Sequence, residues 1–451
     1  MVVLARLLTP HDFGLIAMVT VITGLIIMVS ELGIGTAIVQ RKNITNIQLS
    51  SLFWINIFIS LIVFLFLILL APLIAEFYEQ EVLNKATLIV SLSVLVSPFV
   101  MVQKSLLQRN MNFKVISIAN TLSRVATGLL VIGMAYHGYG FWSLAWQPIL
   151  SVSVTSIFLW KHSVWRPSFS FSFAAVAPML GFGIVTLYNT ILDYSVRGVD
   201  KMLIGKFFGA DTLGVYSRSY YIYLIGINGF SRIFSSIMLP ALSNIQDKKT
   251  LVKASFLKST KLMVTAMFPL IIGLSASADN FILVLFGSKW LGMVDMLHAL
   301  TIIAVATTAG SLVGSLYISQ GNVKLQFKVA LISKLFIIMS MLIGLSWGAL
   351  GVAYGAGIAT VITNYPMVRF AGRSIDMRYR EYIAVIASPL LISIIMGVLV
   401  LLLHMYSPVY IDPIFRLILQ IFIGALSYIL MTFYFDPDVC SEILNVIKRK
   451  K

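Results

Sequence analysis

The sequence predicts an all-α, polytopic membrane protein with about thirteen transmembrane helices. Of its 451 residues, 59% are hydrophobic and only 11% are charged, whereas a soluble domain is about half apolar and a quarter charged. Apolar runs long enough to cross ~30 Å of hydrocarbon recur from one end of the chain to the other. The single cysteine, Cys440, excludes a disulfide framework and a cysteine-built metal site.

The apolar runs, taken in chain order, define the candidate helices. They lie near residues 13–38, 50–75, 83–102, 114–136, 140–160, 174–196, 212–240, 260–286, 292–318, 326–346, 348–368, 382–405 and 412–435. No connection between them reaches twenty residues, which leaves no room for a folded catalytic domain. We therefore expect a helical bundle rather than an enzyme, with no cofactor and no metal.

Basic residues are concentrated in alternate connections between these runs, and they indicate how the helices are oriented in the membrane. Of the 33 Lys and Arg residues, 22 lie on one side and six on the other. The 22 are Arg41, Lys42, Lys104, Arg109, Lys114, Lys161, Arg166, Lys248, Lys249, Lys253, Lys258, Lys261, Lys324, Lys328, Arg369, Arg373, Arg378, Arg380 and the tail 448–451. By the positive-inside rule this side and the C-terminus face the cytoplasm. The net charge of +16 is then topological, with some attraction to anionic headgroups, and no contiguous basic face favours nucleic acid.

Two pairs of segments repeat along the chain. Residues 4–16 match residues 204–216 at an offset of 200, in the pattern of a basic residue, two apolar residues, a small-residue turn and a glycine that opens a long helix. Residues 138–145 mirror residues 348–355 at an offset of 210. Because the paired segments share the same sidedness, we expect a parallel repeat about an axis along the membrane normal.

The repeat predicts the domain organisation. It divides the chain into an N-terminal lobe at 1–172, a C-terminal lobe at 173–375, and two trailing helices with a basic tail at 376–451. The helix at 174–196 precedes the second copy of the repeated motif, so its counterpart is expected just before Met1. The expected fold therefore has fourteen helices, of which this chain lacks the first. The alternative is a genuine thirteen-helix protein.

Several segments resemble motifs of the polysaccharide transporter family, which includes Wzx-like oligosaccharide flippases. They are Leu4-Ala-Arg-Leu-Leu-Thr-Pro-His-Asp-Phe-Gly-Leu-Ile-Ala-Met18, Leu32-Gly-Ile-Gly-Thr-Ala-Ile-Val-Gln-Arg-Lys42, Phe53-Trp-Ile-Asn56, Asp200-Lys-Met-Leu-Ile-Gly-Lys206 and Leu213-Gly-Val-Tyr-Ser-Arg218. The likeness is to exporters of the teichuronic-acid, colanic-acid and lipopolysaccharide type. They share a superfamily with lipid II flippases and multidrug extruders.

The resemblance implies two lobes around a central cavity. It also implies that an undecaprenyl-diphosphate-linked oligosaccharide crosses the bacterial inner membrane by alternating access, driven by an ion gradient rather than ATP. The expected partners are this lipid, membrane lipids and the polysaccharide polymerase or export machinery. A multidrug or cation extruder of the same superfamily is the alternative. A membrane glycosyltransferase is disfavoured, because it should carry a long external loop with catalytic carboxylates.

A phosphorylated sugar headgroup needs a wet, cationic path across the hydrocarbon, where ionisable residues are costly. Four basic residues in the apolar runs are therefore candidate cavity cations: Arg124, Lys334, Arg218 and Arg232. Arg124 and Lys334 share the offset of 210, and each lies roughly 15 Å along a helix from its cytoplasmic loop. The alternative for both is snorkelling to the headgroups.

Glu31, Asp193, Arg197 and Asp200 are candidates for a gate or for ion coupling. Asp193 and Arg197 are spaced i, i+4 and can pair on one helix face. Such pairs could form and break as an outer gate, or a carboxylate could bind a proton or Na⁺; a purely structural ion pair is an equal alternative. Glu31 could hold a proton or, more readily, pair with Arg232, since an unpaired buried carboxylate is costly.

Overall fold

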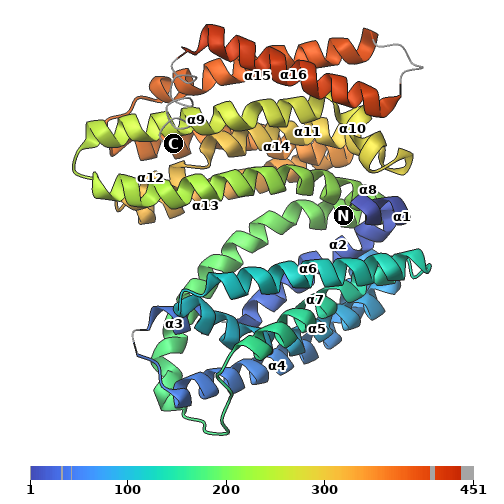
Figure 1. Ribbon diagram of the computed structural model, residues 1–451, viewed down its shortest axis with the longest axis vertical. Coiled ribbons are helices and arrows are strands. Elements are labelled where there is room, and N and C mark those ends of the chain that lie inside the picture. Colours follow the sequence, from blue (N-terminus) through green and yellow to red (C-terminus); the bar gives the residue numbers. More distant parts are fainter. Residues whose placement is uncertain (1, 32–33, 42, 407–411, 438–451) are drawn as a thin grey trace. The chain divides into compact units, whose positions relative to one another are not determined.

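In the part of the chain that it describes, the computed structural model of the protein consists of helices joined by short connections (Figure 1). The described residues are 2–31, 34–41, 43–406 and 412–437, without the side chains of 29–31, 36, 180–197, 228 and 233. They form two compact units, Met1–Ser217 and Arg218–Lys451. The predicted all-α membrane fold is confirmed, because the described residues include eleven helices that are long and apolar enough to cross a membrane.

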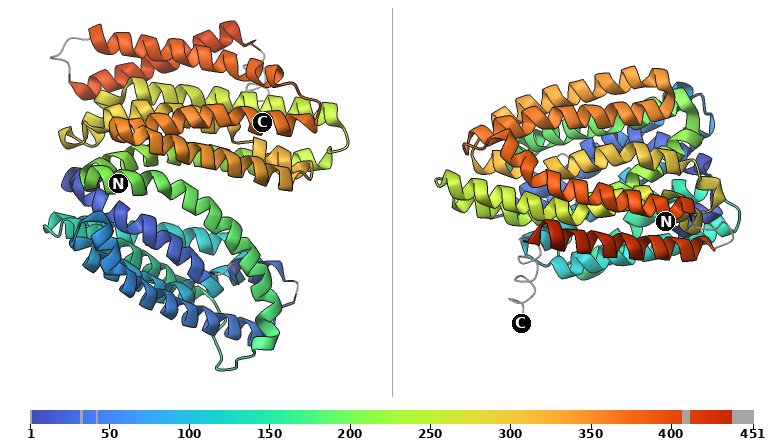
Figure 2. Two further views of the ribbon diagram at one scale, coloured as in Figure 1. Left: turned by 180° about the vertical axis from the view of Figure 1, so that it is seen from behind. Right: turned by 90° about the horizontal axis from the view of Figure 1, so that it is seen from above.

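The long helices of each unit pack side by side (Figure 2). The first unit contains α1 (Val2–Leu7), α2 (Pro10–Glu31), α3 (Ile34–Gln40), α4 (Asn46–Tyr78), α5 (Val82–Arg109), α6 (Phe113–Tyr136), α7 (Phe141–His162) and the first part of α8 (Phe173–Asn244). The second contains the rest of α8, α9 (Lys249–Ala276), α10 (Ala278–Leu285), η1 (Ser288–Trp290), α11 (Met293–Gly310), α12 (Val313–Ser319), α13 (Val323–Gly344), η2 (Leu345–Trp347), α14 (Gly348–Arg373), α15 (Tyr379–Tyr406) and α16 (Pro413–Phe435).

Each of the thirteen predicted runs falls on helical segments, but three of them were wrong in detail, because each contains two helices. The run expected at 13–38 contains α2 and α3, and the run expected at 292–318 contains α11 and α12. The run expected at 260–286 is two helices, because α9 ends at Ala276 and α10 begins at Ala278. Helix α9 also begins at Lys249, so lysines expected in a loop lie in its first turns. Three of them form ion pairs, Lys249–Asp376 at 3.1 Å, Lys253–Glu381 at 2.6 Å and Lys261–Asp436 at 2.6 Å. Helix α9 begins before its apolar stretch, and these ion pairs provide polar contacts for that first part.

Helix α8 contains two of the predicted runs, which are separated by a break at Gly209. The backbone there has φ 79° and ψ −179°, a conformation open to glycine but costly for other residues. A Cβ on Gly205 would lie 3.0 Å from the Leu213 side chain, so the chain folds back at the break. The predicted helix before Met1 and the predicted lobe boundaries at 172/173 and 375/376 stay predictions.

The repeat appears in the backbone as well as in the sequence. Met111 and Gly321, which are 210 residues apart, both have positive φ, at 56° and 70°. Gly138 and Gly348, again 210 apart, also have positive φ, at 84° and 77°. The first pair precedes α6 and α13, and the second pair follows them. Helices α6 and α13 are therefore equivalent parts of equivalent hairpins.

Aromatic packing holds the part of the first unit near the loop that follows α7. The Phe53 ring makes edge contacts with Phe99 at 5.6 Å and Trp165 at 6.0 Å between centroids. The Trp160 indole N–H donates to the Phe99 carbonyl at 2.7 Å. Because lipid is as apolar as a side chain, close packing and hydrogen bonds of this kind hold membrane helices together.

The two copies of the repeated motif cross inside the first unit. A Cβ on Gly14 would lie 1.7 Å from the Ala210 carbonyl oxygen, and a Cβ on Gly214 would lie 1.9 Å from the Pro10 carbonyl oxygen. Since each of these positions differs from its equivalent by 200, the two contacts are one contact made reciprocally. The backbones of α2 and α8 touch directly, which a side chain at either glycine would prevent.

Replacing Gly14 or Gly214 with alanine should destabilise the first unit by roughly 1–3 kcal/mol or more, because the new methyl group must displace a backbone carbonyl. Gly128→Ala is the matched control, since a Cβ on this helical glycine would meet nothing within 4 Å. The measurement is the thermal unfolding midpoint of the detergent-solubilised protein. Equal midpoints for Gly14→Ala and Gly128→Ala would contradict the crossing.

Candidate functional site

The first unit holds one of the four predicted cavity cations. Arg124 lies midway along α6, and its side chain is exposed. Among the described residues it has no ion-pair or hydrogen-bond partner. The preceding residue, Ser123, is buried and donates to the Ser151 carbonyl of α7 at 2.8 Å. Helix α6 therefore turns one face to α7 and presents Arg124 on another.

The other three predicted cations belong to the second unit. Arg218 is partly buried on α8, with its guanidinium 5.6 Å from the centroid of the Tyr221 ring, within the range of a cation–π contact. Arg232, further along α8, is exposed. Lys334 is partly buried on α13 and follows the buried Ser333, as Arg124 follows Ser123. Arg124 and Lys334 therefore both follow a buried serine but differ in exposure, and their role in binding stays a prediction.

Asp200 is a buried carboxylate with two hydrogen-bond donors. Its side chain is 4% exposed, and its oxygens accept from the Tyr216 hydroxyl at 2.6 Å and from the Lys201 backbone N–H at 2.7 Å. Along a continuous helix, Asp200 and Tyr216 would be about 24 Å apart. The break at Gly209 brings them together. Two donors stabilise the negative charge of this buried carboxylate, and a carboxylate in this state can bind a cation.

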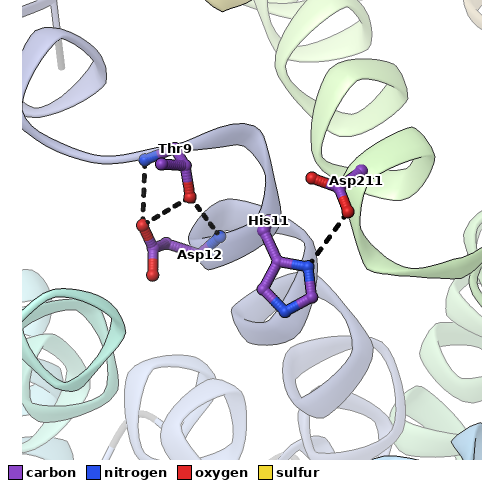
Figure 3. Close-up of polar contacts among 4 residues, drawn as sticks. All are labelled: Thr9, His11, Asp12 and Asp211. Carbon is purple, nitrogen blue, oxygen red and sulfur yellow. Dashed lines mark hydrogen bonds and ion pairs between the residues drawn. The ribbon is translucent and has the colours of Figure 1, made fainter.

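The motif crossing carries polar groups at its end (Figure 3). Thr9 precedes α2, and its N–H and hydroxyl both donate to the Asp12 carboxylate, at 2.9 and 2.7 Å, in a helix cap. His11 Nδ1 lies 3.1 Å from the Asp211 carboxylate. Because 11 and 211 are equivalent positions, this contact joins the two motif copies at the same position of the motif.

An ion pair joins α8 to the end of α4. Lys206 Nζ donates to Glu79 at 2.7 Å and lies 5.5 Å from the centroid of the Phe77 ring. The hydrogen bond from Lys206, and then its charge, hold the pKa of Glu79 below its ordinary value. Since the Glu79 side chain is 81% exposed, the pair contributes little stability and mainly positions the end of the helix.

Three predicted gate residues have side chains outside the described residues. They are Glu31, at the end of α2, and Asp193 and Arg197, in the first part of α8. The predicted Asp193–Arg197 pair and the predicted partner of Glu31 stay predictions.

Sequence reasoning did not single out His11, Asp211 or Tyr216. The first two could have been found from the repeat, because they occupy one position of the motif in its two copies. Tyr216 gave no such signal, since its contact with Asp200 depends on the chain folding back at Gly209.

The polar groups of the described residues are suited to binding ions. Cations on α6, α8 and α13 can attract phosphate or acidic sugars, and Asp200 can bind a cation or a proton. Within these residues no group of three or more His, Cys, Asp or Glu side chains could hold a metal ion.

Comparisons with known proteins agree with this picture. Lipopolysaccharide biosynthesis protein WzxC of Escherichia coli K12 is 28% identical over 405 residues, which cover 87% of this chain and 81% of WzxC. Teichuronic acid biosynthesis protein TuaB of Bacillus subtilis 168 is 28% identical over 429 residues, which cover 93% of this chain and 87% of TuaB.

The fold is similar to that of a solved structure of the lipid II flippase MurJ in an inward closed conformation. The TM-score is 0.77 at 18% identity, with 97% of this chain and 96% of that one covered, a likeness that shows the fold alone. The family model described as polysaccharide biosynthesis protein matches residues 3–295, well over half of the sequence. The chain belongs to this family of polysaccharide biosynthesis proteins.

Proposed function

We propose that this protein is a transporter that carries lipid-linked oligosaccharide or polysaccharide precursors across the bacterial inner membrane. The family match over residues 3–295 carries the proposal. The names of the relatives, which refer to lipopolysaccharide and teichuronic acid biosynthesis, support a glycan substrate. The fold shared with a lipid II flippase supports a lipid carrier. The carrier we propose is undecaprenyl diphosphate, and the polymerase or export machinery would receive the product.

The exposed cation on α6 supports an anionic substrate. A charged side chain within a transmembrane helix is costly when it faces lipid, so Arg124 is expected to face water or a ligand. A guanidinium can bind phosphate through two parallel hydrogen bonds. In this proposal Arg124 and Lys334 attract the diphosphate, and Arg218 and Arg232 complete the cationic path.

Alternating access requires a contact that closes one side of the path and can open again. The motif crossing is suited to this, because its glycines pack without interlocking side chains and His11–Asp211 is a single exposed pair. Asp200 lies on α8 close to the crossing in sequence, and a bound proton or Na⁺ there would couple opening to an ion gradient. Neither step needs a cofactor or catalysis. In this proposal the C-terminus faces the cytoplasm, as the positive-inside rule favours for the side with the basic connections.

Deleting the gene should remove the surface polysaccharide and cause the polyprenyl-linked oligosaccharide to accumulate on the cytoplasmic side. The measurement is lipid extraction followed by mass spectrometry, with rescue by a plasmid that carries this chain. Intact surface polymer in the deletion strain, accompanied by increased sensitivity to cationic drugs, would instead assign the protein to the drug extruders.

Arg124→Gln combined with Lys334→Gln should abolish polymer export while the amount of protein in the membrane stays unchanged. The substitution removes the charges that attract the diphosphate but keeps side chains of similar length. The matched control is Lys258→Gln with Lys328→Gln, exposed lysines within the first ten residues of α9 and α13. Export at the wild-type rate in the Arg124/Lys334 double variant would remove these residues from the mechanism.

Asp200→Asn should reduce transport at least about tenfold, because the amide keeps the shape of the side chain but cannot take up a proton or balance a cation. Transport is measured in proteoliposomes with and without an imposed proton or Na⁺ gradient. Asp279→Asn, at an exposed carboxylate in the first turn of α10, is the control. A gradient-dependent rate that survives Asp200→Asn would place the coupling site elsewhere.

A further inference from the structure

Helix α6 exposes a row of polar side chains within a transmembrane helix. The row consists of Lys114, Ser117, Asn120, Thr121 and Arg124, all exposed, and is called here the α6 polar stripe. Their consecutive spacings of three, three, one and three residues place them along one side of the helix. Among the described residues, none of these five side chains has a hydrogen-bond or ion-pair partner. A transmembrane helix facing only lipid would not carry such a row.

A second exposed row on α6 has the character expected for lipid contact. It consists of Ile118, Leu122, Val125 and Leu129, with exposures of 44%, 44%, 54% and 66%, and is called here the α6 apolar stripe. Its spacings of four, three and four residues place it beside the polar stripe. The exposed surface of α6 is therefore divided lengthwise into a polar half and an apolar half.

Helix α6 packs within the first unit through a face that does not include the polar stripe. Ile116, Ala119, Ser123 and Thr127 are buried on a third face, from which Ser123 donates to the α7 backbone. Near the end of the polar stripe, a Cβ on Gly128 would meet nothing within 4 Å. The fold is thus satisfied by one face of α6, and the polar stripe must serve something outside this packing.

Helix α13 shows what the same position in the fold requires. Its equivalents keep both cations, Lys324 for Lys114 and Lys334 for Arg124, at the offset of 210. They replace the other three polar residues, Ser117, Asn120 and Thr121, with Phe327, Ala330 and Leu331. Phe327 and Leu331 are 45% and 42% exposed, so the two faces differ in chemistry rather than in exposure. The repeat therefore does not need hydroxyl and amide groups here.

We infer that the α6 polar stripe binds the sugar-bearing diphosphate headgroup of the transported lipid, while its tail lies along the α6 apolar stripe. Charge complementarity favours an anionic headgroup on the α6 polar stripe, because α6 contains two cations and no Asp or Glu. Lys114 and Arg124 contact phosphate, and Ser117, Asn120 and Thr121 exchange hydrogen bonds with sugar hydroxyls. The inference rests on the proposed function. It assigns the sugar contacts to α6 and not to α13, whose Lys334 attracts only the phosphate.

Cysteine labelling tests whether the stripe is wet and whether it binds the head. In a Cys440→Ser background, single variants Ser117→Cys, Thr121→Cys, Ile118→Cys and Leu122→Cys are purified in lipid nanodiscs and treated with a charged methanethiosulfonate. Cysteines at 117 and 121 should react at least about tenfold faster than those at 118 and 122, because a thiol in hydrocarbon does not ionise. Added undecaprenyl diphosphate should slow the reaction at 117 and 121, and undecaprenol should not.

The equivalent positions of α13 provide the matched control. Phe327→Cys and Leu331→Cys should react as slowly as the cysteines on the α6 apolar stripe. Equal rates at 117 and 118 would overturn the wet stripe, and equal slowing by both lipids would overturn headgroup binding. Labelling needs no polymer export, so a negative gene-deletion result beside positive protection would reject the proposed function and leave the binding face standing.

A swap between the repeats tests the stripe in cells. Ser117→Phe with Thr121→Leu gives α6 the α13 residues and should reduce polymer export at least about tenfold, since an apolar face cannot solvate the head. Phe327→Ser with Leu331→Thr, the reciprocal change, should leave export unchanged. Normal export from a well-expressed α6 swap would overturn the assignment.

Discussion

An unsatisfied backbone amide in hydrocarbon costs several kcal/mol, and the architecture follows from this constraint. Helices satisfy their own amides, so the described chain is built from helices, and connections stay short. Since lipid provides no hydrophobic drive between helices, their association depends on close packing and a few polar contacts. The crossing of Gly14 and Gly214 is one such contact between the two motif copies, and it brings the backbones of α2 and α8 together.

The same constraint makes polar side chains informative. Some described polar groups are bonded within the protein, such as Asp200 by Tyr216 and Ser123 by the α7 backbone. Others, in the α6 polar stripe, have no partner among the described residues. Comparison of α6 with α13 distinguishes residues that the fold requires from residues that we assign to transport. Both helices keep the turn before them, the buried serine and the two cations, whereas the hydroxyl and amide groups between these cations occur only on α6.

Particular residues show how far prediction from sequence reaches. Arg124 stood out because a charge interrupts an apolar run, and its link to Lys334 followed from the constant offset. The start of α9 was misplaced by eleven residues, because lysines in its first turns look like a loop until their acidic partners on distant segments are known. His11 and Asp211 were recognisable as equivalent positions, but nothing in the spacing showed that equivalent positions meet.

By itself the sequence determined the membrane environment, the all-α class, the repeat and the family resemblance, because each depends on composition or periodicity along the chain. Tertiary structure alone decided which polar groups pair and which faces are covered. Asp200 and Tyr216 would be about 24 Å apart along a helix, and only the break at Gly209 brings them within 2.6 Å. Likewise, the polar residues of α6 acquired a meaning only when α7 was seen to cover another face, since a helix carries residues on all sides and packing selects which remain exposed.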